Sequence, residues 1–487
     1  MNITVTVEIC NDVFESFPQL EEAAYQIGLK VGRSIMKYCL EKEDKKLMGE
    51  RDSERFRDKG LRSTCIKTKC GSVEYNRRVY RDLFAKEGDH KCVYLLDQKL
   101  DVQKIGTFTS GFCRLVASSV CESTYRKAAR QITEQTGQEI SAQGVWNIIQ
   151  KLGEMQKERA EQNAELAKKS QGKGTVETQL LYEEDDGIWL HLQGESRKTH
   201  GRSKEMKVGI AYDGVMWKEN KEGKKRRILN NKIAYAEFGS AKEYLEKKEG
   251  LIASKYDVDA IELRVVNGDG AAWTKRKKEE NVIAVLDEYH RNKKITECIK
   301  DPTIKTNIRE YLYSGDIDTL MDYIEAATNS IDDEKEIEGL QKLYKYYDEN
   351  REALKDYYDR GIEIPPTRKP GELHHARLGS MESNIFTLIG NRMKGRRFNW
   401  SIKGADNLAS ILCAYHTTGM EALFAELPGE PEIEKWIDEG KPLAAKDNKI
   451  FAGKGYEYPA SVSTQASPYW LRDIAKMNGF SDLKLRF

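Results

Sequence analysis

Apolar and polar positions follow a helical period in the first part of the chain and the period of strands in the next. Between residues 17 and 52, apolar side chains recur at helical spacing, which predicts one long amphipathic helix. A β-rich stretch follows at 65–82, with a turn at 70–72, and leads into the apolar segment 93–100. Residues 107–154 return to a helical pattern. The first part of the chain is therefore predicted to be mostly helical, with a small β-rich part.

Two helices joined by a glycine turn are predicted within residues 123–153. The first ends at Gly137 and the second begins after Ser141, a residue type that caps helix N-termini. This arrangement is typical of a helix-turn-helix, whose second helix lies in a groove of DNA. Two packed helices without a role in DNA binding fit the pattern almost as well. A glycine-rich segment near 170–176 then marks a domain boundary.

Past this boundary the pattern alternates strands with helices. We predict a β-hairpin at 178–194 whose turn contains Asp186 and Gly187. The next elements are, in order, strands at 206–214 and 231–238, a helix at 240–256, a strand at 260–270, a short helix at 271–281 and a strand at 282–290. A ribonuclease H-like fold has this order: three antiparallel strands, a helix, a strand, a helix and a strand. The predicted fold class is therefore α/β with a ribonuclease H-like core.

A single carboxylate, Asp269, stands between two glycines where the apolar run VVNG ends. On its own this pattern is explained equally well by a turn or a helix cap. In a ribonuclease H-like fold, however, the catalytic acids lie on the first strand, just after the fourth strand and on a late helix. Asp186 and Asp269 occupy the first two places. The third is then Glu382, on a predicted helix with apolar residues Ile385, Leu388 and Ile389 on one face.

The long segment between the last core strand and the helix of Glu382 is helical and charged. It is predicted to form an all-helical insertion, and its mixed charge favours contact with protein over contact with phosphates. A solvated helical buttress is the alternative. The predicted regions are a mostly helical N-terminal DNA-binding region at 1–175, the first part of the core at 176–290, the insertion at 291–370, the final helical part of the core at 371–425 and a C-terminal tail at 426–487.

Basic residues gather in clusters, although the formal net charge is only +1. Residues 51–110 contain 14 Lys or Arg against 9 Asp or Glu, and further clusters occur at 221–227, 274–278 and 391–400. A charged run is usually a solvated face. Aromatic residues among the arginines favour a nucleic-acid surface, because phosphates attract Lys and Arg while rings stack on unpaired bases. The candidate DNA-binding residues are Arg77, Arg78, Arg81, Lys275, Arg276, Arg392, Arg396 and Arg397.

Cysteine usage and the N-terminal segment indicate the compartment. Nine cysteines without a CxxC pair favour reduced thiols over a disulfide framework or a zinc ribbon. Cys65, Cys70 and Cys92 could ligate a metal, but no histidine is spaced as their partner. The N-terminus lacks the basic start and apolar core of a secretory signal, and no membrane span is predicted. We therefore expect a cytoplasmic protein.

Four segments together carry a resemblance to a known family: YEEDDGIWLHLQG, VVNGDGAAW, LDEYH and SMESNIFTLIGNRMKGRRFNWSIKG. They resemble bacterial insertion-sequence transposases of the ISLre type, DDE enzymes related to the Mutator-like group, and the likeness spans most of the chain. It implies that Asp186, Asp269 and Glu382 are the DDE acids, with Glu184 as a substitute for Asp186. Asp287 and His290 match the D-x-x-H of Mutator-like enzymes. His290 would orient a phosphate or support a metal ligand, and a local helix-start hydrogen bond is the alternative.

The resemblance also implies an activity. Two Mg²⁺ or Mn²⁺ ions per active site would be held by the three acids and would promote strand cleavage at the ends of the element, followed by strand transfer into target DNA. The expected partners are DNA and further copies of the chain, at the bacterial nucleoid. A ribonuclease H-like nuclease without joining activity, or a non-catalytic DNA-binding protein derived from a transposase, are the alternatives.

Overall fold

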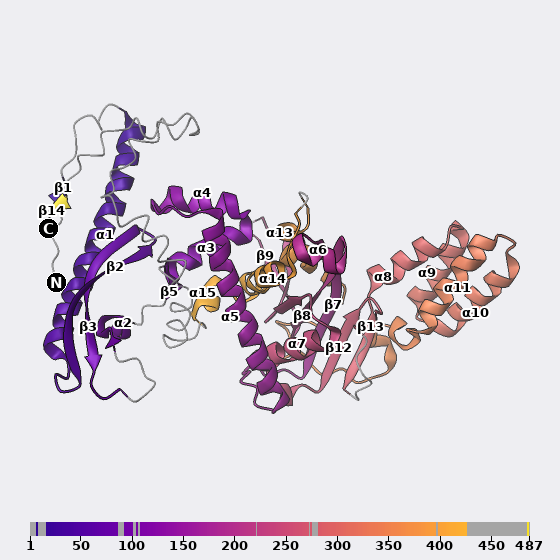
Figure 1. Cartoon of the computed structure of the whole chain (residues 1–487). Coiled ribbons are helices and arrows are strands. Elements are labelled where there is room, and N and C mark those ends of the chain that lie inside the picture. The colour runs from indigo at the N-terminus through magenta and orange to yellow at the C-terminus, as the bar shows by residue number, and fades with distance from the viewer. Residues whose placement is uncertain are drawn as a thin grey trace. The chain divides into compact units, whose positions relative to one another are not determined.

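The computed structural model describes residues 6–7, 16–85, 92–100, 104–105, 108–220, 222–271, 273–274, 281–395, 398–425 and 485–486. The chain forms two compact units, both mixtures of helices and strands (Figure 1). Unit 1 comprises Met1–Lys151 with Phe424–Phe487, and unit 2 comprises Leu152–Leu423. The division between the units falls within helix α5 (Ala142–Lys168), before the glycine-rich segment 170–176. The architecture is therefore mixed α/β, as predicted at that level.

Unit 1 begins with the predicted long helix, α1 (Phe17–Glu50), which packs on a β-hairpin. The hairpin consists of β2 (Phe56–Thr68) and β3 (Gly71–Asp82). Their shared apolar cluster contains Met36, Leu40 and Leu47 of the helix and Ile66, Val73 and Tyr75 of the hairpin. Gly71 has φ +104, and a Cβ there would lie 2.7 Å from the Arg33 guanidinium, so this turn requires glycine.

The apolar segment 93–100, which follows the hairpin, is mostly helical. Only β4 (Cys92–Val93) pairs with β3, and α2 (Leu95–Leu100) follows at once. Leu96 is the one residue of α2 that is fully buried against the hairpin. A short helix can bury a single residue in this way with one of its sides. A short apolar run does not distinguish the two structures. The remaining short strands of unit 1 are β1 (Thr6–Val7), β5 (Lys104–Ile105), β6 (Phe108–Thr109) and β14 (Leu485–Arg486).

Helices follow in the order that the sequence predicts. α3 (Ser110–Glu122) precedes α4 (Tyr125–Thr136), which ends at Gly137 in the left-handed conformation with φ +63. The hydroxyl of Ser141 then accepts a hydrogen bond of 3.0 Å from the amide of Gly144 in the first turn of α5. The predicted pair of helices around Gly137 is therefore present.

Unit 2 is built on a five-stranded mixed sheet with the order β11-β8-β7-β12-β13. β7, β8 and β11 are antiparallel neighbours, whereas β12 runs parallel to β7 and β13 runs parallel to β12. The strands are β7 (Leu180–His191), β8 (Ser203–Tyr212), β11 (Ile233–Glu237), β12 (Leu263–Gly268) and β13 (Val282–Leu286).

The predicted hairpin turn at Asp186 and Gly187 is wrong, because both residues lie inside the continuous strand β7. Asp186 pairs with Val208 of β8, and Gly187 pairs with Lys207. A Cβ on Gly187 would lie 2.2 Å from the Glu205 carboxylate, so this glycine allows a neighbouring side chain to approach. The chain reverses later, through the short helix α6 (Gly194–His200).

Helices pack around this sheet. α7 (Ala241–Lys255) begins with a capping box of Ser240 and Glu243 and contributes Ile252 to a cluster with Leu181 of β7. The helical stretch that carries Glu382 and the helices after it lead back to the sheet. They are α12 (Met381–Ile385), the π-helical η5 (Phe386–Gly390), α13 (Asn391–Met393), α14 (Ile402–Thr417) and α15 (Gly419–Ala425), while η2 (Val258–Ala260) precedes β12.

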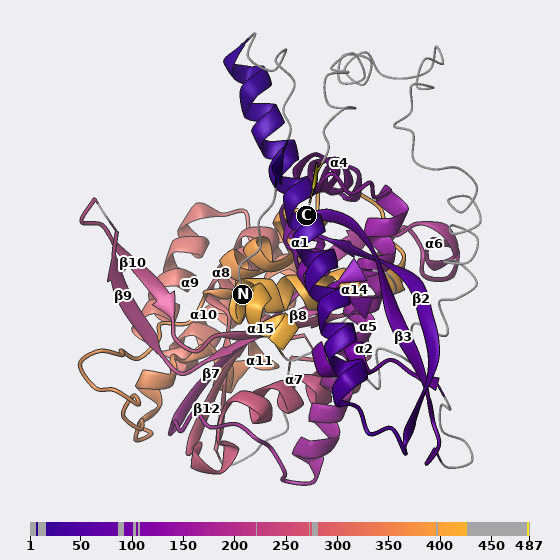
Figure 2. The ribbon, with the colours of Figure 1, turned by 90° about the vertical axis from the view of Figure 1, so that its left-hand side faces the viewer.

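Two further parts extend from the sheet. A ribbon of β9 (Val215–Glu219) and β10 (Lys225–Leu229) lies between β8 and β11 in the chain, and the sequence pattern did not reveal it (Figure 2). The second part follows β13 and is helical, with an apolar cluster that includes Leu320, Leu340 and Tyr347. Its elements are α8 (Glu288–Cys298), α9 (Pro302–Ser314), α10 (Ile317–Ser330), α11 (Glu334–Asp348), η3 (Arg351–Leu354) and η4 (Tyr357–Arg360). In the described part of the chain, no helix has the length and apolar character to cross a membrane.

Candidate active site

The acidic run of β7 places alternate side chains on the two faces of the sheet. Glu183 and Asp185 share one face, where the ammonium of Lys248 from α7 lies 2.9 Å and 2.7 Å from their carboxylates. All three side chains are at most 2 % exposed. Arg264 supplies a second cation, 2.7 Å from Glu183, so these two acids are neutralised inside the protein. The opposite face is left for Glu184 and Asp186.

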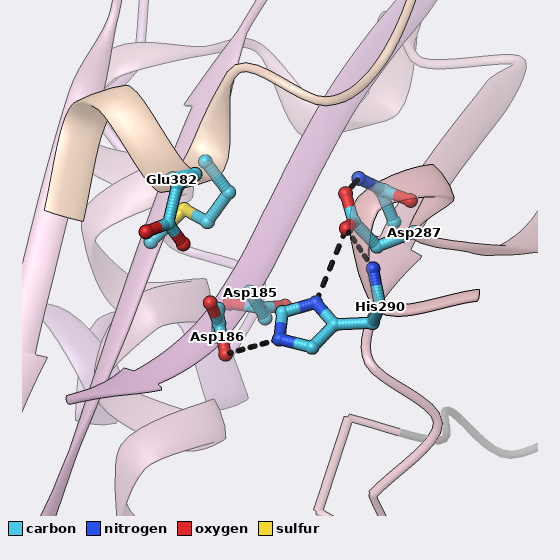
Figure 3. A pocket seen from close by; sticks show the side chains of 7 residues that line it. Asp185, Asp186, Asp287, His290 and Glu382 are labelled. Atoms are coloured by element: carbon cyan, nitrogen blue, oxygen red, sulfur yellow. Dashed lines mark hydrogen bonds and ion pairs between the residues drawn. The ribbon is translucent and has the colours of Figure 1, made fainter. Parts of the chain in front are cut away.

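A pocket opens on that opposite face, and its lining comes from segments far apart in the sequence (Figure 3). Asp186 comes from β7, His290 from the first turn of α8 and Glu382 from the first turn of α12. The complete lining is Asp185, Asp186, Asn267, Asp287, His290, Met381 and Glu382. Two of the three predicted acids thus share one pocket.

Asp186 is 8 % exposed, and burial raises the pKa of its carboxyl to about 6. The negative charges of Asp269 and Glu382 contribute to this rise in the pKa. His290 and the amide of Gly187, which donates a hydrogen bond of 2.7 Å, act in the opposite direction. The charges of both other predicted acids therefore act on Asp186.

His290 links two of the acids. Asp287 caps α8 and accepts hydrogen bonds of 3.1 Å from both the backbone amide and Nδ1 of His290. The other ring nitrogen, Nε2, lies 3.8 Å from Asp186. The hydrogen bond with Asp287 raises the pKa of His290, and the charge of Asp186 adds to this effect. The local helix-start hydrogen bond and the contact with Asp186 therefore occur together.

Asp269 lies directly after β12, in a turn that fixes its carboxylate. Oδ1 accepts hydrogen bonds from the amide of Ala271 at 2.8 Å and from the hydroxyl of Thr274 at 3.3 Å. The backbone carbonyl of Asp269 accepts a hydrogen bond of 2.8 Å from the hydroxyl of Tyr346 in α11. The turn interpretation of this acid is thus correct, and it coexists with the electrostatic effect on Asp186.

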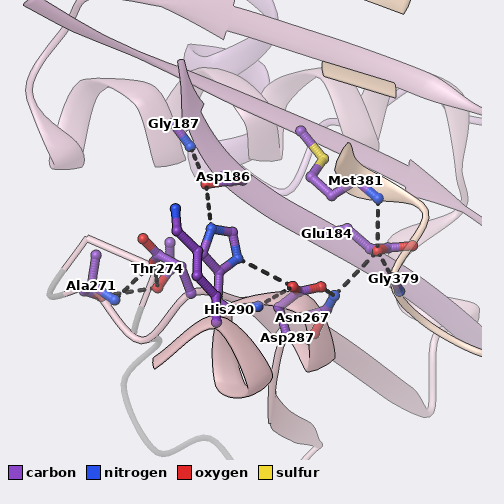
Figure 4. Close-up of polar contacts among 12 residues, drawn as sticks. Glu184, Asp186, Gly187, Asn267, Ala271, Thr274, Asp287, His290, Gly379 and Met381 are labelled. Carbon is purple, nitrogen blue, oxygen red and sulfur yellow. Dashed lines mark hydrogen bonds and ion pairs between the residues drawn. The ribbon is translucent and has the colours of Figure 1, made fainter. Parts of the chain in front are cut away.

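Glu184 lies on the same face as Asp186 but is fully buried (Figure 4). Its Oε2 accepts hydrogen bonds from Asn267 at 3.2 Å and from three consecutive backbone amides at 2.8–3.2 Å, those of Gly379, Ser380 and Met381. Oε1 accepts a hydrogen bond of 2.7 Å from the hydroxyl of Tyr212. Both carboxylate oxygens of Glu184 are thus engaged within the protein. Glu184 anchors the segment before Glu382, a role that no local sequence signal reveals.

The donor atoms at the pocket suit a hard divalent cation. Mg²⁺ takes carboxylate and amide oxygens, usually one or two protein carboxylates completed by water and phosphate oxygens. The buried Oδ1 of Asn267 has no hydrogen-bond partner among the residues that the structure describes. Within those same residues, however, no three His, Cys, Asp or Glu side chains are placed to hold an ion by themselves. The site therefore fits such an ion only when further oxygens come from solvent or substrate.

The predicted DNA-binding arginines have different surroundings. Arg77 pairs with Asp97 and lies 3.8 Å over the ring of Tyr94, and Arg78 lies 3.2 Å from Asp58. These two guanidinium groups are thus engaged within unit 1, whereas Arg81 is exposed. Arg392 is only 7 % exposed, because its guanidinium packs over the rings of Phe398 and Trp400. The remaining candidates, Lys275, Arg276, Arg396 and Arg397, lie outside the described residues.

The fold and site define a mixed α/β protein with an acidic pocket on one face of its central sheet. Residues 11–424 match the model of a family described as "Uncharacterised protein family (UPF0236)", and the chain belongs to this family. A relative from Streptococcus gallolyticus, the "UPF0236 protein in vanSb 3'region", is 23 % identical over 405 residues. The matched region covers 81 % of this chain and 82 % of the relative.

Proposed function

We propose that this chain is a DDE-type transposase of an insertion sequence, with a ribonuclease H-like core in unit 2. One observation carries the proposal. Three antiparallel strands are followed by two parallel ones in the order β11-β8-β7-β12-β13, and acids stand on the first strand, just after the fourth and on a later helix. These acids are Asp186, Asp269 and Glu382. Asp186 and Glu382 line the pocket, and the charges of Asp269 and Glu382 act on Asp186.

The three carboxylates and the oxygen of Asn267 would hold Mg²⁺ or Mn²⁺, two ions per active site, together with phosphate oxygens of the DNA. Such ions activate a water or a 3′-hydroxyl and stabilise the leaving oxygen in phosphodiester displacement. The protein itself leaves the carboxylate of Asp186 available to a metal ion. Above about pH 6 its carboxylate is ionised, and it faces His290 with no Lys or Arg ion pair among the described residues. Glu184 holds the segment before Glu382 in place.

DNA binding is assigned to unit 1 and is supported by the surface of its helix pair at 123–153. The first turns of α5 expose Gln143, Trp146 and Asn147, and amide side chains can pair with adenine in the major groove. Arg57 and Arg81 are cross-strand neighbours and both are exposed on the hairpin. Two adjacent cations suit contacts with phosphates. We propose that several copies of the chain assemble on the DNA ends.

The test uses the purified full chain and duplexes made from the DNA that flanks its gene. With Mg²⁺ or Mn²⁺, the wild type should cut one strand at a defined position and join the new 3′ end to a plasmid. Asp186→Asn, Asp269→Asn and Glu382→Gln should each abolish both steps while DNA binding is retained. Asp259→Asn changes an exposed acid ten residues before Asp269 and serves as the matched control.

The outcomes separate the rival functions. Cleavage without joining under all ion conditions would favour a nuclease. Binding to DNA without any cleavage, and unchanged by the three substitutions, would favour a non-catalytic DNA-binding protein. Full activity in any of the three acid variants would remove that acid from the proposed site.

A further inference from the structure

The ribbon of β9 and β10 is a basic feature of unit 2 that the site does not use. Residues 215–229 contain six Lys or Arg against two Glu, an excess of four positive charges. The described residues from 217 to 226 are all exposed, and over this range the two strands pair with each other. The ribbon extends away from β7 and β8 (Figure 2). Its outer half therefore contributes little to the core and is open to a partner.

The ribbon carries a pair of like charges that destabilises it. Lys218 and Arg226 are direct cross-strand partners, so two cations face each other on one side of the ribbon. Like charges in this position repel each other. Neither side chain forms an ion pair with any residue that the structure describes. An anionic partner would relieve this repulsion, and closely spaced cations suit the successive phosphates of a nucleic acid.

The other side of the ribbon presents an aromatic ring. Trp217 is 55 % exposed and pairs across the strands with Arg227. A flat ring on a narrow basic ribbon is a combination that binds single-stranded nucleic acid, because the ring stacks on an unpaired base while nearby cations contact the backbone. The chemistry of the ribbon thus favours a nucleic-acid strand with unpaired bases over an acidic protein.

The base of the ribbon is tied to the segment that leads into the pocket. Val215 and His374 exchange two backbone hydrogen bonds of 3.0 Å and 2.8 Å. Arg227 donates a hydrogen bond to the carbonyl of Arg377, an exposed residue five positions before Glu382. The same segment is held by Glu184 at residues 379–381. Basic residues therefore lie both on the ribbon and, at Arg377, on the segment that leads to the acidic pocket.

We propose that the β9–β10 ribbon and Arg377 hold the DNA strand beside the phosphate to be cleaved, with Lys218 and Arg226 on phosphates and Trp217 stacked on an unpaired base. This inference rests on the proposed function for the position of the scissile phosphate. The binding of DNA by the ribbon is testable without catalysis.

The experiment measures the affinity of the full chain for a blunt DNA duplex and for the same duplex with a single-stranded 3′ overhang. Lys218→Glu with Arg226→Glu should weaken binding of both probes at least about tenfold, and should lower the slope of log affinity against log salt by about two. Trp217→Ala should weaken binding of the overhang probe about tenfold and leave the blunt probe unchanged.

Matched controls come from the same unit. Lys335→Glu with Lys342→Glu makes the same change of charge on exposed positions of α11. Trp189→Ala removes a ring of similar exposure, 57 %, on the face of β7 opposite to Asp186. Both controls should bind DNA as the wild type does. All variants should unfold at the wild-type temperature, since the substituted side chains are exposed.

Ribbon variants that bind like their controls would overturn the inference, even if the wild type cleaves DNA. An RNA overhang that binds at least as tightly as DNA and depends on Trp217 would overturn the assignment to DNA. Absence of cleavage by the wild type, combined with the expected binding losses, would reject the proposed function and leave the ribbon as a DNA-binding surface.

Discussion

The carboxylate of Glu184 on β7 accepts a hydrogen bond of 2.8 Å from the backbone amide of Ser380, two residues before Glu382. Neighbouring amides at Gly379 and Met381 donate to the same oxygen. One buried acid thus connects the strand of Asp186 to the start of the helix that carries Glu382. The relative position of these two acids depends on it.

We expect Glu184→Ala to lower the free energy of unfolding by about 3 kcal/mol, because several buried donors, including the hydroxyl of Tyr212, lose their acceptor. Glu184→Gln should cost about 1 kcal/mol, since its oxygen can still face the amides of 379–381. Urea unfolding measures both values.

The rate of strand cleavage distinguishes a positioning role of Glu184 from a purely structural one. Well below the unfolding temperature, Glu184→Ala should cut DNA far more slowly than the wild type and bind it equally well, while Glu184→Gln should recover most of the rate. Glu195→Ala, at an 80 % exposed side chain, is the control. Equal cleavage rates in Glu184→Ala and the wild type would remove the positioning role.

Asp186→Asn should stabilise the metal-free protein at pH 8. Burial raises the pKa of Asp186 from its ordinary value of 3.8 to about 6. Between these values the unfolded chain releases the proton and the folded chain keeps it, so stability falls as pH rises through this window. Above about pH 6 the wild type has lost all of the stability that this titration can remove. At about 1.4 kcal/mol for each pH unit, it amounts to about 3 kcal/mol.

The measurement is urea unfolding in EDTA from pH 4 to pH 8. The variant should gain about 1–3 kcal/mol over the wild type at pH 8 and little at pH 4, because loss of the contact with His290 offsets part of the gain. Added Mg²⁺ should stabilise only the wild type. A difference that does not change with pH would show that Asp186 titrates normally.

The sequence predicted strands near all five positions of the sheet, in their order along the chain, because each strand carries its own apolar pattern. It misplaced one turn, since Asp186 and Gly187 have the residue types of a hairpin turn, while pairing with β8 holds them inside a continuous strand. It also missed β9 and β10, whose exposed strands lack the alternation that a buried face imposes.

Within the site, the sequence indicated which residue types carry the chemistry but not their partners. The four acids at 183–186 look equivalent along the chain. Their division into a pair bound to Lys248, an anchor at Glu184 and an available carboxylate at Asp186 depends on the face of β7 and on α7 and α12. These contacts join residues far apart in sequence, which a pattern in one chain does not reveal.

Lys248→Met should lower the free energy of unfolding by about 3–5 kcal/mol, because it leaves Asp185 buried without its cation. Lys242→Met is the control on the same helix. This side chain is 85 % exposed and lies 3.8 Å from Glu246, so its loss should cost less than about 0.5 kcal/mol.

A second substitution tests the cause. Adding Asp185→Asn to Lys248→Met removes the unpaired charge and should recover at least about half of the lost stability in thermal unfolding. No recovery would indicate that packing of the lysine stem, rather than charge, dominates at this position.

The last prediction concerns the helical part that follows β13. Its helix α11 reaches the site through Tyr346, whose hydroxyl donates a hydrogen bond of 2.8 Å to the carbonyl of Asp269. Tyr346→Phe should lower the free energy of unfolding by about 1 kcal/mol and slow strand cleavage several-fold, because the turn that orients Asp269 loses one of its hydrogen bonds. DNA binding should be unchanged.

Tyr344→Phe is the matched control on the same helix, since its hydroxyl makes no hydrogen bond with a described residue although its ring packs on the same apolar cluster. Single-turnover cleavage of the two variants gives the comparison. A slower rate in Tyr346→Phe alone would connect the helical part to the orientation of Asp269. Equal rates in both variants would leave it as a buttress, because the ring packing that both retain would then be its whole contribution.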